Sequence, residues 1–162
     1  MSIRIDLCTE IPATPEAVWA AIEDVRTHTR WMADARRITV LGEKHHGVGT
    51  EFECLTMVGP LRMTDRMRVT EWEPARAMAI EHRGAVTGWG RFTLHPAAQG
   101  TRFCWREDLS FPWWLGGRLG ELAGKWVLTR VWRNNLERLR THVVEVSGPR
   151  TSPSPGPAPE SS

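Results

Sequence analysis

The chain opens with a strict alternation of apolar and polar side chains. Between residues 3 and 11, apolar residues share one face of an extended segment and charged residues share the other. This period of two predicts a half-buried β-strand. Thr14 and Pro15 follow, a pair typical of a helix start, because threonine caps the first turn and proline has a φ that suits the first helical position. Apolar residues at helical spacing then predict one short helix to about residue 25 and a second from 28 to 33.

From residue 36 to residue 111 the pattern predicts strands only. Six extended runs are separated by turn signals, among them the segments HHGVG and PAAQG and the pair Gly59-Pro60. Short connections join antiparallel neighbours, so these runs and the first strand predict a seven-stranded antiparallel sheet. The absence of a helical pattern in this stretch argues against a doubly wound parallel sheet.

A long helix is predicted from about residue 115 to residue 146. Its apolar residues fall on two faces: Leu122 and Trp126 belong to one, and Leu128 and Trp132 to the other. Glycines crowd its first half and favour a kink or a late start between residues 117 and 124. After a single domain over residues 1–146, a Pro- and Ser-rich stretch from 147 to 162 predicts a disordered tail.

Composition narrows the range of functions. With 162 residues and 41% hydrophobic content the chain suffices for one domain with a core. A net charge of +2 gives no bulk electrostatic support to nucleic-acid binding, and the lack of a run of about 18 apolar residues argues against stable membrane insertion. The absence of an apolar leader and three widely separated cysteines, Cys8, Cys54 and Cys104, predict a cytoplasmic protein with reduced thiols.

Six short motifs follow one another along the chain: PEAVW at 15–19, WM at 31–32, GVGT at 47–50, VTEWEP at 69–74, GTRF at 100–103 and NLERL at 135–139. Their order resembles that of the START-like or Bet v 1-like superfamily, whose bacterial members are grouped as SRPBCC or polyketide cyclase/dehydrase and lipid-transport proteins. The resemblance covers about residues 3–145 and implies an α+β helix-grip fold. In that fold a curved seven-stranded antiparallel sheet wraps around the long C-terminal helix, two short helices lie between strands 1 and 2, and an apolar cavity lies between sheet and helix.

Three titratable residues fall on otherwise apolar strand faces: Asp65, His82 and Glu107. Such groups in a pocket are candidates for acid/base catalysis, here the removal of a proton next to a carbonyl and protonation of the enolate oxygen. Two alternatives remain open. A one-residue shift of register would turn each side chain to solvent, and a buried carboxylate could simply pair with an arginine.

The expected ligand-binding residues combine inward strand positions with aromatic residues near the cavity mouth that the resemblance implies. The set is Met63, Asp65, Met67, Ile80, His82, Phe92, Phe103, Trp105, Glu107, Trp113, Trp114, Leu122 and Trp126. No metal site is predicted, because the His45-His46 pair stands in a turn with no further ligand at suitable spacing. No cofactor is expected.

Three functions follow from the resemblance and the apolar faces. The favoured one is binding, and possibly transport, of a hydrophobic small molecule such as a lipid, a quinone or a polyketide. The alternative is a polyketide cyclase or dehydratase that uses acid/base residues in the same cavity, and the third is a protein-interaction module. Neither the ligand nor the oligomeric state is specified by the sequence.

Overall fold

The computed structural model describes residues 2–112 and 117–148, and of residues 117–121 the backbone only. The elements in chain order are β1 (Ser2–Ile11), α1 (Pro15–Ile22), the 3-10 helix η1 (Val25–Arg30), β2 (Ala35–Leu41), β3 (Glu51–Val58), β4 (Leu61–Glu73), β5 (Ala77–Arg83), β6 (Thr87–Ala97), β7 (Gly100–Ser110) and α2 (Gly117–Ser147). Two predicted features, the side chains of Trp113 and Trp114 and the tail from residue 149, lie outside the described residues.

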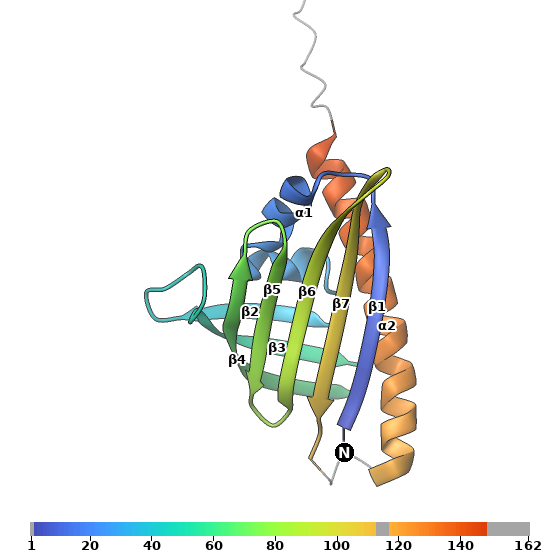
Figure 1. The fold of residues 1–162 in the computed structure, drawn as a ribbon. Helices are drawn as coiled ribbons and strands as arrows, with labels where there is room; N and C mark the ends of the chain where they lie inside the picture. Colours follow the sequence, from blue (N-terminus) through green and yellow to red (C-terminus); the bar gives the residue numbers. More distant parts are fainter. Residues whose placement is uncertain (1, 113–116, 149–162) are drawn as a thin grey trace, which may run out of the picture.

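All seven strands form one antiparallel sheet in the order β1-β7-β6-β5-β4-β3-β2. Figure 1 shows the sheet curling so that β2 and β3 run across behind β5 and β6, while α2 runs alongside β1. Along the chain, the short helices α1 and η1 connect β1 to β2. This arrangement confirms the predicted α+β helix-grip fold.

The helix starts follow from capping residues. The Thr14 hydroxyl accepts a hydrogen bond from the Ala17 N–H at 3.3 Å, and Pro15 occupies the first helical position of α1. Asp24 caps η1 by accepting from the Arg26 N–H at 3.0 Å. Because this cap precedes Val25, the second short helix begins earlier than the predicted residue 28.

Helix α2 runs without a break from Gly117 to Ser147, so the glycines coincide with its start rather than with an interruption. Among the side chains of α2 that the structure describes, those of one apolar face pack inward. Trp132, Leu136, Leu139 and Val143 are buried, whereas Leu122 and Trp126 are 70% and 68% exposed. In the part of the chain that the structure describes, no helix has the length and apolar character needed to cross a membrane.

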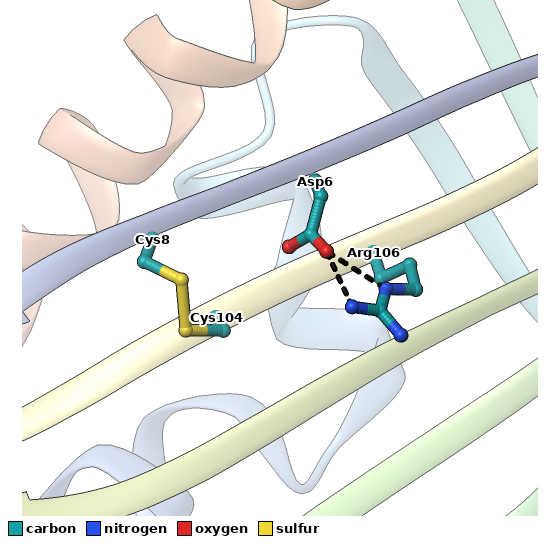
Figure 2. Close-up of a disulfide and its surroundings, with 4 residues drawn as sticks. All are labelled: Asp6, Cys8, Cys104 and Arg106. Carbon is teal, nitrogen blue, oxygen red and sulfur yellow. Dashed lines mark hydrogen bonds and ion pairs between the residues drawn. A yellow bond between two sulfur atoms is a disulfide. The ribbon is translucent and has the colours of Figure 1, made fainter.

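Cys8 and Cys104 form a disulfide between β1 and β7 (Figure 2). The two cysteines lie directly opposite each other in the strand register, with their Cα atoms 4.1 Å apart. Asp6 and Arg106, which are also opposite each other on these strands, form an ion pair in which Arg106 Nε donates to the Asp6 carboxylate at 2.8 Å. The prediction of three reduced thiols is therefore wrong for these two cysteines. A separation of 96 residues along the sequence concealed a contact that only the pairing of β1 with β7 creates. Cys54 is a free, buried thiol.

Candidate functional site

A cavity of about 330 Å³ lies between the concave face of the sheet and α2. This volume falls at the lower end of the roughly 300–1,000 Å³ range of ligand pockets. Its walls are mainly apolar, with Met63, Met67 and Ile80 from the sheet and Leu128 and Trp132 from α2. The cavity thus occupies the position that the sequence resemblance implies.

Aromatic rings form the wall where β6 and β7 meet α2. Trp105 of β7 stacks on Trp132 of α2 with ring centroids 5.0 Å apart, and it meets Phe92 of β6 edge-on at 5.3 Å. All three side chains are buried and line the cavity. The stacked pair connects the sheet directly to the helix and fixes one side of the cavity.

Glu107 presents a carboxylate to this apolar space. The Trp105 indole N–H donates to Glu107 Oε1 at 2.8 Å, which orients the carboxylate within β7. Gly90 stands opposite Glu107 in the register of β6 and β7. A methyl group at position 90 would lie only 2.7 Å from Glu107 Cδ, so the glycine leaves the space that the carboxylate occupies.

His82 of β5 lies opposite Gly88 in the register of β5 and β6, and its side chain meets the same carboxylate across β6. Its Nε2 lies 3.4 Å from Glu107 Oε2, and the two side chains are 9% and 6% exposed. Within the described residues, neither ring nitrogen of His82 nor Oε2 of Glu107 has a hydrogen-bond partner. Two hydrogen-bonding groups thus face the cavity with unused capacity, which is uncommon for buried polar atoms.

Asp65 of β4 adds a second carboxylate to the cavity wall. It is 4% exposed, and its Oδ1 accepts from the Val86 N–H at 3.4 Å. Gly84 makes room for it, since a methyl group there would lie 3.0 Å from Asp65 Cγ. Burial raises the pKa of Asp65, and the Val86 N–H and the charge of His82 oppose that rise.

Four polar residues that sequence reasoning missed also line the cavity, namely His28, Asp34, Cys54 and Thr56. The His28 Nε2 donates to the Ile22 carbonyl at 2.7 Å, and burial lowers the pKa of this histidine to about 4. The Asp34 carboxylate accepts a hydrogen bond from Asn135 Nδ2 at 2.6 Å. Burial raises the pKa of the Cys54 thiol to about 11. His28 and Asp34 lie outside the strands, where alternation gives no signal for orientation.

The structure brings eight of the residues expected to bind ligand to the cavity wall. They are Met63, Asp65, Met67, Ile80, His82, Phe92, Trp105 and Glu107. Phe103 instead lies in the closed core at 0% exposure. Leu122 and Trp126 are not part of the wall, because the inward face of α2 carries Gly124, Leu128 and Trp132. Of the FPWWLGG segment at 111–117, Phe111 lines the cavity.

Metal ligation finds no support in the described ranges 2–112 and 117–148, where no three His, Cys, Asp or Glu side chains gather around a common point.

Comparisons with known proteins agree with this geometry. The family model described as "Polyketide cyclase / dehydrase and lipid transport" matches residues 2–144. No curated protein matches the sequence significantly. Among solved structures, the ZhuI aromatase/cyclase from Streptomyces sp. R1128 superposes with a TM-score of 0.76 at 14% identity, over 91% of this chain and 99% of that one.

Two further structures superpose similarly. TTHA0849 from Thermus thermophilus has a TM-score of 0.72 and 19% identity, over 91% of this chain and 100% of that one. The di-domain aromatase/cyclase StfQ from the steffimycin biosynthetic pathway has a TM-score of 0.72 and 13% identity, over 91% of this chain and 52% of that one. At these identities the likeness shows the fold alone.

Proposed function

The chain belongs to the polyketide cyclase / dehydrase and lipid transport family, and we propose that it binds a compact, largely apolar small molecule in the cavity between its sheet and α2. The observation that carries this proposal is the cavity itself, about 330 Å³ of space with mainly apolar walls. Protein interiors are close-packed, and few voids exceed the size of a water molecule. A space of this size therefore indicates a binding site better than imperfect packing of a core.

The volume favours a compact ligand over a lipid with two acyl chains. The flat rings of Trp105, Phe92 and Trp132 offer stacking and edge contacts that suit a planar molecule. The open cavity also disfavours a protein-interaction module, the third function considered, because that function needs the cavity closed.

A second candidate function is a cyclase or dehydratase. The observation that favours it is the approach of His82 Nε2 to Glu107 Oε2 at 3.4 Å in the same cavity as Asp65. A base there would remove a proton from the carbon next to a ligand carbonyl, and a protonated group would donate to the resulting enolate oxygen. Two of the structural neighbours are described as aromatase/cyclases, which is consistent with this chemistry.

Binding is tested by titration with the neutral fluorescent dye N-phenyl-1-naphthylamine. We expect saturable binding by the wild type and a loss of about tenfold or more in affinity for Met67→Trp, whose larger ring would fill the cavity. The matched control is Val144→Trp on the outer face of α2, where the wild-type side chain is 43% exposed. Absence of saturable binding, or an equal loss in both folded variants, would contradict the proposal.

Incubation of the protein with a linear polyketone, followed by mass spectrometry for loss of water, tests the second candidate.

A further inference from the structure

We propose that His82 and Glu107 together anchor a hydroxyl group of the ligand, so that the cavity selects hydroxyl-bearing apolar molecules over the corresponding hydrocarbons. This inference rests on the proposed binding function and adds the chemical class of the ligand. It follows from the hydrogen-bonding capacity that the two side chains leave unused.

The Glu107 carboxylate is held in one orientation. Trp105 Nε1 donates to Oε1 at 2.8 Å, and Gly90 leaves space for the carboxylate on the neighbouring strand. Oε2 is thereby directed toward His82, at 3.4 Å from Nε2, and among the described residues it has no hydrogen-bond partner. A buried acceptor without a partner is costly, so a group that donates to Oε2 gains the full benefit of satisfying it.

A hydroxyl group matches both side chains at once. It donates one hydrogen bond and accepts others, so it can donate to Glu107 Oε2 and accept from an N–H of His82. The ring nitrogen beside Glu107 is Nε2, so the match requires the Nε2–H tautomer or the imidazolium, and Nε2 donates in both forms. Both side chains line the cavity and are at least nine-tenths buried.

Other polar groups satisfy the pair less well. A carbonyl oxygen accepts from His82 but has no proton to offer Glu107. A carboxylate would be repelled by Glu107 and by Asp65, which lines the same cavity. An ammonium group donates but cannot accept, so it would leave the N–H of His82 unpaired, and it would also incur the desolvation penalty of a full charge.

The test compares two probes of the same shape, 2-naphthol and naphthalene, by calorimetric or dye-displacement titration at neutral pH. For the wild type we expect 2-naphthol to bind about 10- to 100-fold more tightly, the range that corresponds to a hydrogen bond with a charged group. Glu107→Gln keeps an oxygen for the Trp105 N–H but places an NH₂ where the acceptor was. We expect this variant to reduce the preference to about threefold or less.

A second variant and a control keep the result interpretable. His82→Phe removes the donor and retains a ring of similar size, and it should also reduce the preference. Val144→Leu changes a residue on the outer face of α2 that is 43% exposed and lies outside the cavity wall, and it should leave the preference intact. A preference that survives in both Glu107→Gln and His82→Phe would overturn the assignment to this pair. Equal binding of the two probes by the wild type would overturn the hydroxyl inference while leaving the binding function standing. Failure of both probes to bind would contradict the hydroxyl inference and the proposed binding function together.

Discussion

Gly90 and Glu107 face each other across β6 and β7, and the Glu107 carboxylate fills the space in which a side chain at position 90 would stand. Strand β6 separates β5 from β7, so His82 and Glu107 belong to strands that do not touch. Gly88 lies opposite His82 and Gly90 lies opposite Glu107, so no side chain of β6 separates the two groups, which approach over the face of the sheet to 3.4 Å. Two residues without side chains thus determine where His82 and Glu107 meet.

Gly90→Ala should therefore perturb the protein through Glu107. We expect a loss of about 1–3 kcal/mol in the free energy of unfolding, because the added methyl group forces the carboxylate to move and strains its bond with Trp105. Urea denaturation measures this loss. In the Glu107→Ala background the same substitution should be neutral or stabilise by about 0.5–1 kcal/mol, since glycine weakens a strand interior relative to alanine. Equal effects in the two backgrounds would show that Gly90 and Glu107 are independent.

The Cys8–Cys104 disulfide should stabilise the fold by joining the edge strand β1 to β7. Reduction, or the double substitution Cys8→Ser and Cys104→Ser, should lower the free energy of unfolding by about 2–4 kcal/mol, chiefly because the cross-link restricts the unfolded chain. Urea unfolding with and without a reductant measures the loss.

Thiol titration in denaturant provides the control for that prediction. Of the three cysteines in the chain, Cys54 alone should react before reduction, and all three should react after it. Three reactive thiols in the untreated protein would show that the bond does not form. In the folded protein Cys54 should react slowly, because burial raises the pKa of its thiol to about 11.

Much of the cavity wall could be predicted from the sequence, because alternation along a strand is a local property. Asp65, His82 and Glu107 each share a strand face with apolar neighbours, and the structure places all three in the wall. Their mutual arrangement is not local. The approach of His82 to Glu107 depends on the order of the strands and on Gly90, and the Cys8–Cys104 bond depends on the register of β1 with β7.

The orientation of α2 was harder to predict for a different reason. Apolar residues occupy two of its faces, so periodicity alone does not say which face is buried. Packing against the sheet selects the face of Leu128 and Trp132, and it leaves Leu122 and Trp126 exposed. Leu122 and Trp126 illustrate that a large apolar residue on a helix is no evidence of burial by itself.

His28 should make the stability depend on pH in the mildly acidic range. Burial lowers its pKa from 6.5 to about 4 in the folded protein. Between these values the unfolded chain binds a proton that the folded chain does not, so stability is lost as the pH falls from about 6.5 to 4 and no further loss arises from this residue below 4. The full loss is about 3 kcal/mol.

His28→Gln isolates this contribution from that of the carboxylates. The amide can still donate to the Ile22 carbonyl but does not titrate. As the pH falls from about 6.5 to 4, the free energy of unfolding of the wild type should decrease relative to that of His28→Gln. A difference that stays constant from pH 7 to pH 4 would show that His28 is not buried in its neutral form.

Two tryptophans of α2 test which face of the helix meets the cavity. Trp132 is 6% exposed and stacks on Trp105, whereas Trp126 is 68% exposed and absent from the cavity wall. Trp132→Ala should cost about 3–5 kcal/mol of stability, because it removes a large buried ring and enlarges the cavity. Trp126→Ala should change stability by no more than about 0.5 kcal/mol and leave the affinity for N-phenyl-1-naphthylamine nearly unchanged.

Trp132→Phe keeps an aromatic contact with Trp105 and should retain most of the stability while altering dye affinity, which separates the role in binding from the role in folding. A marked loss of dye affinity in Trp126→Ala at unchanged stability would place the ligand on the outer face of α2 and would contradict the cavity as the binding site.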